Sequence, residues 1–450
     1  MFRICPLIFF LSLIGGSSAW TQYRPPTELP FIVIDTDGKR IPDEPKVAAR
    51  MRILDQRDPA LPYRPDTTAG VAYDGFVGIE LRGSSSKRFP KKGYGIETRR
   101  RDGSDRTANL LGMGREEDFV LHGPYSDKTL IRNAFAYQLA EELTGWAPGV
   151  RLVELMIDDD YRGVYLLTEK IKRDQQRIAL TKPGDREDAL TGGYVLKIDK
   201  FTGEDEKSGA AFASHHVDRL THNATVRFLF HDPAPDEITA AQRAYITAWL
   251  HEFERVLASE DFAHPERGYR RLIDARSFAD YFLLTELSRN VDGYRISTYF
   301  QKERDSRGGR LRMGPVWDFN IAFGNADYCD AVETSGWTYR INARCGGKNW
   351  PVPFWWRRML EDPEFRTVVR NRWRELRVGA WSEAQLAARI QEMVAAMGDA
   401  PQRNHDRWQT LGKEIWPNAY VGDTYEAEIA HLTAWIQRRA RWMDRAMAEW

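Results

Sequence analysis

The spacing of apolar residues changes near residue 235, and this change limits the folds open to the chain. From Phe31 to Asp232, apolar and polar residues alternate in short runs such as "GFVGIELRG", a pattern that predicts β-strands. From Pro235 to Trp450, apolar residues recur at helical spacing instead. We therefore expect an α+β protein of two unequal lobes, with a strand-rich N-terminal lobe and a helical C-terminal lobe.

The N-terminus has the pattern of a cleavable export signal. Arg3 precedes an apolar run from Ile4 to Ile14, and small residues follow as far as Ala19. No other run approaches the ~20 apolar residues that a membrane-spanning helix needs. We expect a secreted, periplasmic or cell-envelope protein whose mature chain begins near Trp20 and has no stable membrane span.

The formal charges of the chain cancel, because 65 Lys and Arg residues face 65 Asp and Glu residues. A balanced charge gives no general attraction to polyanions, so we expect no nucleic-acid partner.

The cysteines suggest one disulfide. Cys5 lies in the expected signal, which leaves Cys329 and Cys345 in the mature chain. In an oxidising compartment these two can pair and close a short loop, with a stabilisation of ~3 kcal/mol. Two free buried thiols are the alternative.

Short segments of the first half predict individual elements. The strand "GFVGIELRG" runs into a tight loop from Gly83 to Ser86, and a second strand, "KKGYGIETR", follows it. Ser126 or Asp127 can cap an amphipathic helix from about residue 127 to 143. The runs "RLVELMID" and "GVYLLTEKI" flank a turn at residues 158–162 and predict a β-hairpin, and "GGYVLKID" predicts a further strand.

The second half contains three long apolar stripes at helical spacing. They predict helices over residues 237–257, 275–287 and 424–450. Such stripes more often form core than ligand sites. In the polar segment before them, His215, His216 and His222 fit a solvated loop better than a metal site.

The stretch "NVDGYRISTYFQKERDSRGGRLRMGPVWDFNIAFG" carries the most chemical information. Asp292 follows a predicted helix, Asp318 follows a predicted strand, and the segment between them has the pattern of a hairpin that can bring both acids to one cleft. Phosphoryl transfer needs one carboxylate to orient or deprotonate the attacking hydroxyl and another to hold magnesium. Asp292 suits the first role and Asp318 the second. Alternatively, Asp292 caps a turn and Asp318 forms a structural salt bridge.

Upstream residues suggest where nucleotide phosphates can bind. The loop from Gly83 to Ser86 is of phosphate-binding size, and Lys92 follows it, with Arg82, Ser84 and Ser85 as further donors. Three basic neighbours compete with Lys92 for this role, namely Lys87, Arg88 and Lys91. An ordinary basic strand edge would explain the same residues.

Glu169 ends the segment "GVYLLTE", where the chain leaves the strand-rich lobe. It can face a nucleotide or a cation there, or it can pair with a neighbouring lysine on the surface. Motifs of other chemistries are missing: the Gly-Lys-Ser/Thr of a Walker loop, a nucleophile elbow and a dinucleotide-binding glycine fingerprint do not occur in a suitable context.

Five ordered motifs resemble the CotH (spore-coat protein H) kinase family. They are "ELRGSSSKRFPKKGYGIE", "HGPYSDKTLIRNAFAYQLAEELTG", "VELMIDDDYRGVYLLTEKI", "ARSFADYFLLTELSRNVDG" and "GPVWDFNIAFG", and the C-terminal "EIAHLTAWIQRRARWMD" is similar to that family's closing helix. The resemblance covers about Gly78 to Gly324.

The resemblance implies an atypical protein-kinase-like two-lobed fold that binds ATP with Mg²⁺ or Mn²⁺ and phosphorylates a protein substrate. By position, Asp292 matches the family's catalytic aspartate and Asp318 its metal-binding aspartate, with Asn320 beside it. Arg82, Lys92 and Glu169 lie in family motifs as well.

Together, the residue patterns and the resemblance predict four segments: a signal peptide at 1–19, an N-terminal extension at 20–60, a nucleotide-binding lobe at 61–234 and a helical catalytic lobe at 235–450. Two departures from the family's pattern concern the metal site. Asn320 stands where the family often has a second aspartate, and Ser297 stands where an asparagine commonly follows the catalytic aspartate. They favour the alternative of a catalytically degenerate surface or envelope protein that acts in binding or assembly.

Overall fold

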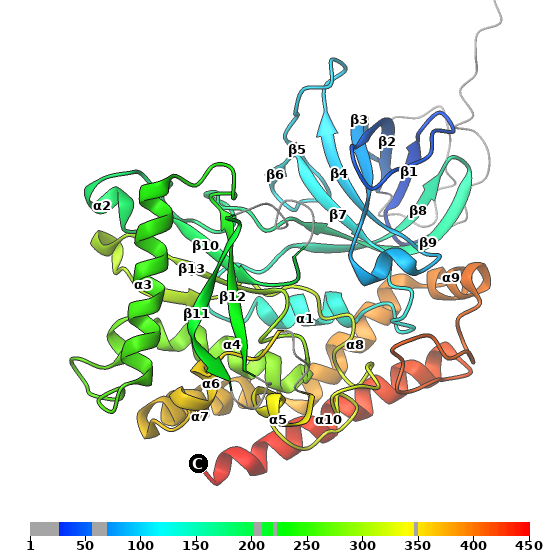
Figure 1. Ribbon diagram of the computed structural model, residues 1–450. Coiled ribbons are helices and arrows are strands. Elements are labelled where there is room, and N and C mark those ends of the chain that lie inside the picture. The colour runs from blue at the N-terminus through cyan, green and yellow to red at the C-terminus, as the bar shows by residue number, and fades with distance from the viewer. Residues whose placement is uncertain (1–26, 56–69, 202–208, 219–222, 346–349) are drawn as a thin grey trace, which may run out of the picture.

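The computed structural model describes residues 27–55, 70–201, 209–218, 223–345 and 350–450. The expected signal peptide and His222 lie outside these residues. The expected mixture of strands and helices is confirmed, with most strands in the first half and most helices in the second (Figure 1).

Seven strands of the first half close into a barrel of order β1-β2-β3-β4-β7-β9-β8. Their bounds are β1 Phe31–Asp35, β2 Val47–Leu54, β3 Val71–Arg82, β4 Gly93–Arg99, β7 Asp118–His122, β8 Val150–Ile157 and β9 Asp160–Glu169. Neighbouring strands are antiparallel except β1 and β8, which are parallel and close the barrel. A short ribbon of β5 (Ala108–Asn109) and β6 (Arg115–Glu116) adjoins it.

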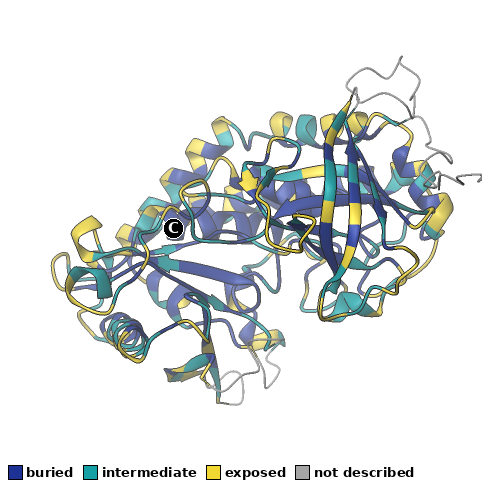
Figure 2. Ribbon diagram, turned by 90° about the horizontal axis from the view of Figure 1, so that it is seen from above, coloured by how far each residue is buried: buried dark blue, intermediate teal, exposed yellow. Residues whose placement is uncertain are grey.

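The barrel interior follows from the alternation along each strand. On β3, Tyr73, Val77 and Ile79 point into an apolar core, and the residues between them form the outer face. Figure 2 shows this alternation as bands of exposed and buried residues along the barrel strands. The expected hairpin at residues 158–162 is confirmed, because β8 and β9 pair across Asp158 and Asp159.

A second sheet of five strands has the order β11-β12-β10-β13-β14. Its strands are β10 Tyr194–Ile198, β11 Ala211–Asp218, β12 Ala224–Asp232, β13 Thr298–Lys302 and β14 Leu311–Met313. The expected hairpin between Asp292 and Asp318 is the antiparallel pair β13 and β14. Because β10 pairs with β13, this sheet joins strands from both sides of residue 235.

Helices make up most of the second half and pack around α4, whose residues are nearly all buried. The helices are α1 Arg132–Ala140, α2 Glu187–Leu190, α3 Ala240–Ala258, α4 Ala275–Ser288, α5 Asn342–Cys345, α6 Trp355–Met359, α7 Pro363–Val378, α8 Glu383–Met397, α9 Ala400–Trp408 and α10 Tyr425–Ala448. Short 3-10 turns are η1 Ser85–Arg88, η4 Tyr269–Arg271, η5 Asp305–Arg307 and η6 Thr338–Arg340. Figure 1 shows α10 running beneath the molecule and α9 below the barrel. No helix in the described part of the chain is long and apolar enough to span a membrane.

Helix α1 is shorter than the sequence predicts, since it begins at Arg132 and not near Asp127. The carboxylate of Asp127 accepts the backbone N–H of Thr129 at 3.2 Å and of Arg132 at 2.9 Å. Leu130 adopts a positive φ of 66° between them. Asp127 therefore fixes a tight turn before the helix.

Cys329 and Cys345 form a disulfide with a Cα–Cα distance of 5.2 Å. The disulfide is thus favoured over the alternative of two free thiols, and it closes the segment that follows the Asp318 region.

Candidate functional site

A cavity of about 430 Å³ is lined by residues from the barrel and from the second half of the chain. The barrel contributes the ends of β3, β4, β7 and β9 and the loop after β3. The second half contributes Asp292, Ser297, Trp317, Asp318 and Asn320. The structure therefore brings together six of the residues that the sequence predicts, namely Arg82, Ser84, Ser85, Asp292, Asp318 and Asn320.

The barrel side of the cavity is the outer face of neighbouring strands. Glu80, Val120 and Thr168 line the cavity and stand in one row with Gly95, because Glu80 pairs with Gly95, Gly95 with Val120 and Val120 with Thr168. Arg82 is the next outward-facing residue of β3 after Glu80. Its guanidinium lies 5.2 Å from the ring centroid of Trp317. Arg82 therefore connects the barrel to the residue next to Asp318.

The loop after β3 closes tightly at Gly83. Gly83 has a φ of 118°, and a Cβ at this position would lie 2.1 Å from Ser86 Oγ. Only glycine fits this backbone without a clash. The tight turn holds Ser84 and Ser85 at the edge of the cavity, as the sequence predicts for a phosphate-sized loop.

Asp318 is held by its backbone. Its N–H donates to the Tyr137 hydroxyl oxygen at 3.3 Å, and the next N–H, of Phe319, donates to Asn133 Oδ1 at 2.6 Å. Asn290 Nδ2 donates to the carbonyl of Asp318 at 3.3 Å. With these contacts Asp318 keeps a positive φ of 63°, a conformation that aspartate tolerates better than most residues. Helix α1 and the end of α4 thus fix the orientation of this segment.

The carboxylate of Asp318 is exposed to the cavity but surrounded by protein. Removal from bulk water, together with the charges of Asp292 and Asp199, raises its pKa to about 6, against the opposing charges of Lys200 and Arg82. Several carboxylates therefore repel one another here. A divalent cation relieves such repulsion, and carboxylate, amide and hydroxyl oxygens are the ligands that Mg²⁺ and Mn²⁺ prefer. The donor set of Asp318, Asn320 and Ser297 fits such an ion.

Asp292 follows α4 in a tight turn. Its carbonyl accepts the N–H groups of Arg295 and Ile296 at 2.9 and 2.8 Å. Its carboxylate accepts a hydrogen bond from Arg295 Nη2 at 3.2 Å, and the same nitrogen lies 3.9 Å from Cys329 Sγ. Arg295 therefore links the Asp292 carboxylate to the disulfide.

Lys92 and Glu169 do not line the cavity. Lys92 Nζ donates to the carbonyl of Lys87 at 2.5 Å. Glu169 accepts the N–H of Gly149 at 2.8 Å and pairs with Arg177 at 2.9 Å, and burial raises the pKa of its carboxyl group. The predicted roles of both residues in nucleotide binding gain no support from these positions.

Lys91, a competitor of Lys92, is fully buried. Its Nζ donates to the carbonyl of Val164 at 2.6 Å and to Asn404 Oδ1 at 2.7 Å, and burial holds its pKa well below the usual value. Lys91 therefore connects the barrel to α9 rather than facing the cavity.

Several cavity residues escaped the sequence analysis. Asp199 and Lys200 line the cavity and follow β10 directly. Two charged residues at the end of a predicted strand were the only sequence feature that could have identified them. Tyr328 and Trp416 also line the cavity and stack with ring centroids 6.2 Å apart. Nothing in the local sequence pairs these two rings, which come from segments far apart in the chain.

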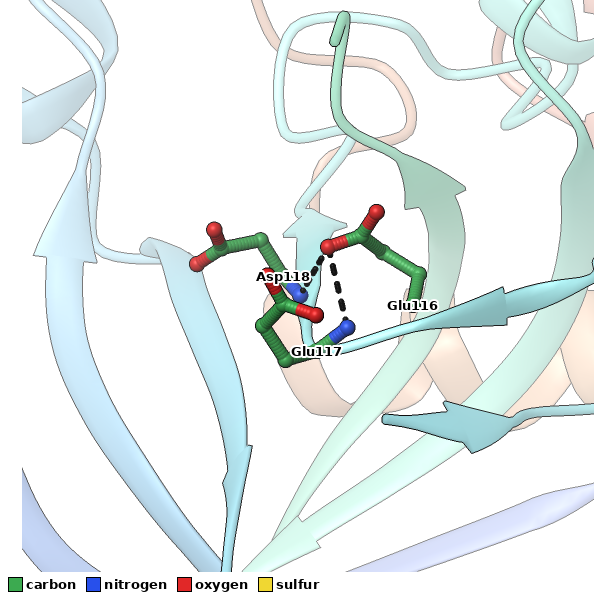
Figure 3. Close-up of side chains that lie close together, drawn as sticks. All are labelled: Glu116, Glu117 and Asp118. Carbon is green, nitrogen blue, oxygen red and sulfur yellow. Dashed lines mark hydrogen bonds between the residues drawn. The ribbon is translucent and has the colours of Figure 1, made fainter. Parts of the chain in front are cut away.

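A second acidic group lies outside the cavity. Glu116, Glu117 and Asp118 have carboxylate oxygens within 4.8 Å of one another, and Glu116 accepts the N–H groups of the other two (Figure 3). The ammonium of Lys172 lies 2.6, 3.0 and 2.7 Å from their carboxylates. Arg177 also pairs with Glu116 at 3.2 Å and Lys170 with Asp118 at 3.9 Å, so basic side chains of the protein already pair with this group. His215 and His216 lie on β11, where His215 stacks on His251 with centroids 3.5 Å apart, and no metal-ligating group forms around them among the described residues.

Comparison with known families adds one finding. The family model described as CotH kinase protein matches residues 79–443, which is most of the chain and includes the cavity residues from Glu80 to Asn320. No match to a curated protein was found.

Proposed function

The chain belongs to the CotH kinase protein family, and we propose that it is an exported atypical protein kinase that transfers the γ-phosphoryl group of ATP to a hydroxyl group of a protein. The observation that carries this proposal is the meeting of Asp292 and Asp318 in one cavity beside the tight loop at Gly83. In this proposal the barrel acts as the nucleotide-binding lobe and the helical half as the catalytic lobe of a kinase-like fold.

The chain's own residues divide the work as follows. Asp292, held by Arg295, orients the acceptor hydroxyl and receives its proton. Arg82 and the donors of Ser84 and Ser85 bind phosphate oxygens. Asp318, with Asn320, would hold Mg²⁺ or Mn²⁺, which when bound neutralises charge on the phosphates.

Export of the chain is supported by two independent features. Residues 1–19 have the pattern of a signal peptide, and Cys329 and Cys345 are paired. Disulfides persist mainly in oxidising compartments outside the cytosol.

A degenerate binding or assembly protein is the second candidate. Asn320 and Ser297 both line the cavity and offer neutral oxygens where a stronger metal site would have a carboxylate and an amide. Thermal-shift titration with ATP and metal separates the two candidates. A competent site gains stability as RT ln(1 + [L]/Kd), whereas a degenerate one gains little from the metal.

Incubation of the chain without residues 1–19 with labelled ATP, Mg²⁺ or Mn²⁺ and candidate proteins tests the transfer. We expect incorporation that Asp318→Ala and Asp292→Asn abolish and that Asp261→Ala, a change at an exposed aspartate, leaves intact. Intact-mass spectrometry of the product identifies which part of the nucleotide is transferred. Incorporation no higher than that of Asp318→Ala would refute phosphoryl transfer.

A further inference from the structure

A second cavity, of about 780 Å³, lies on the outer face of the barrel near β3 and β4. Six arginines line it, and we call it the arginine groove: Arg50, Arg99, Arg100, Arg101, Arg106 and Arg115. Asp74 is the acidic residue among its lining residues. Because the formal charge of the whole chain is zero, this is a local concentration of positive charge.

Part of this charge is neutralised inside the protein. Asp74 pairs with Arg50 at 2.9 Å, and Glu97 pairs with Arg99 at 2.6 Å. The other four arginines are exposed and form no ion pair with a carboxylate in the described part of the chain. Arg100 donates to the carbonyl of Asp105 at 2.5 Å, and Arg115 reaches the hydroxyl of Thr107 at 3.5 Å. Their positive charge remains available to a ligand.

Two glycines of β3, of which Gly75 lines the groove, let groove arginines approach the strand backbone closely. A Cβ on Gly78 would lie 2.5 Å from the guanidinium carbon of Arg99, and a Cβ on Gly75 would lie 3.0 Å from Arg106 Nη1. Each guanidinium therefore lies close to bare backbone of β3, that of Arg99 at Gly78 and that of Arg106 at Gly75. Phe76, between these glycines, has 41% of its surface exposed. An exposed aromatic ring with surrounding cations suits an extended acidic peptide, which offers both carboxylates and apolar side-chain atoms.

The groove and the catalytic cavity share one face of β3. Phe76 lines the groove and Arg82 lines the cavity, and both belong to the outward-facing set of alternate residues. They are six positions apart along the strand, which corresponds to roughly 20 Å at the usual rise of a strand. Between them Lys46 pairs with Glu80 at 3.4 Å and with Glu97 at 3.2 Å, so this stretch carries balanced charge.

We propose that the arginine groove binds an acidic segment of the protein substrate. The segment then lies roughly 20 Å from the cavity, so about six or more extended residues separate it from the acceptor hydroxyl. This inference rests on the proposed kinase function. It adds a substrate class, a protein with an acidic segment at a distance from its phosphorylated hydroxyl.

Fluorescence anisotropy with a labelled octaglutamate peptide, and octaglutamine as its neutral control, tests the groove. The triple variant Arg100→Ala/Arg101→Ala/Arg115→Ala removes exposed arginines that carry no ion pair. The matched control Arg255→Ala/Arg267→Ala/Arg441→Ala removes exposed arginines of the second half. Circular dichroism establishes that both variants are folded.

We expect the native chain and the control to bind octaglutamate with a salt-dependent Kd, and the triple variant to bind it at least about tenfold more weakly. Equal binding by the triple variant, or no binding by the native chain, would overturn the inference. So would a heparin fragment that binds the groove where octaglutamate does not.

The ATP-labelling assay separates this inference from the proposed function. If labelling occurs but octaglutamate does not bind, the groove inference fails alone. If octaglutamate binds through the groove but no phosphoryl group is transferred, the proposed function fails and the groove stands as a site for acidic peptides.

Discussion

Asn133 of α1 accepts a hydrogen bond from the backbone N–H of Phe319 at 2.6 Å. This bond joins a helix that lies between two barrel strands in the chain to the segment that carries Asp318. One turn further along α1, the Tyr137 hydroxyl accepts the N–H of Asp318 itself at 3.3 Å. The position of the Asp318 carboxylate therefore depends on α1 as well as on the hairpin before it.

Asn133→Ala should weaken ATP and metal binding by about tenfold. It leaves a buried N–H of Phe319 without its partner, which costs about 1–3 kcal/mol of folding free energy. Thermal unfolding and ATP titration measure the two effects. Asn342→Ala is the control, because Asn342 is also buried and bonds the N–H and carbonyl of Val352. It should lower stability alone, and an equal loss of ATP affinity in both variants would contradict the role of Asn133.

Arg82→Ala should lower the affinity for ATP more than about tenfold, and Lys92→Ala less than about threefold. Arg82 lines the cavity beside Trp317, whereas the ammonium of Lys92 is bonded to the carbonyl of Lys87 outside it. Charge-assisted hydrogen bonds to phosphate are among the stronger polar contacts. Isothermal titration with ATP measures both, and a larger loss in the lysine variant would restore the assignment made from the sequence.

Local patterns predicted the strands β3, β4, β8, β9 and β10, the two hairpins and the meeting of Asp292 with Asp318, whereas β11 forms where a solvated loop was expected. Alternation and turn residues are properties of short segments, and the hairpin from Thr298 to Met313 follows from them directly. Closure of the barrel does not. It needs β1 to pair with β8, so that Phe31 lies opposite Glu154, and no local pattern contains a contact between segments that far apart.

The same limit explains why some predicted site residues lie outside the cavity. Arg82 and Lys92 are both basic residues next to one loop, and only the pairing of strands decides that Arg82 faces the cavity. Asp199 reaches the cavity because β10 pairs with β13, which brings the end of β10 near the Asp292 turn. The strand face and strand pairing of a residue therefore identify cavity residues better than its position in a sequence motif.

Asn320→Asp should tighten Mn²⁺ binding by about tenfold, because it adds a carboxylate to the oxygen ligands of the cavity. Without metal the same change should lower stability, since it adds a negative charge near Asp318. Thermal-shift titration with Mn²⁺ measures both effects, with Asn109→Asp at an exposed position as control. Unchanged metal affinity would mean that Asn320 does not face the ion.

Cys329→Ser/Cys345→Ser should lower the free energy of unfolding by about 3 kcal/mol, as expected for a loop between cysteines 16 positions apart. It should also lower activity, because Arg295 contacts both Asp292 and Cys329. Denaturant unfolding and ATP-dependent labelling below the melting temperature separate the two losses. Full activity of the folded variant would show that the disulfide acts on stability alone.

Titration of Glu254 should lower the free energy of unfolding as pH rises from about 4.5 to 7. Its side chain is 1% exposed, and burial raises its pKa from 4.5 to about 7, against hydrogen bonds from Trp355 Nε1 at 2.9 Å and Ser214 Oγ at 2.8 Å. The contribution of Glu254 to the free energy of unfolding is fully present below pH 4.5, where its carboxyl group is protonated in both the folded and the unfolded chain. As pH rises toward 7, the unfolded chain loses the proton and the folded chain keeps it, so about 3 kcal/mol is lost across that window.

Glu254→Gln isolates this effect, because glutamine resembles the protonated acid and does not titrate. Buried histidines such as His231 and His405, whose pKa values burial lowers to about 4, increase stability as pH rises over much of the same range. They are present in both chains and cancel in the difference. Denaturant unfolding at pH 4.5 and pH 8 should therefore show the variant gaining about 2–3 kcal/mol on the native chain. A difference that does not change with pH would mean that Glu254 stays ionised in the folded protein and that its hydrogen bonds from Trp355 and Ser214 outweigh its burial.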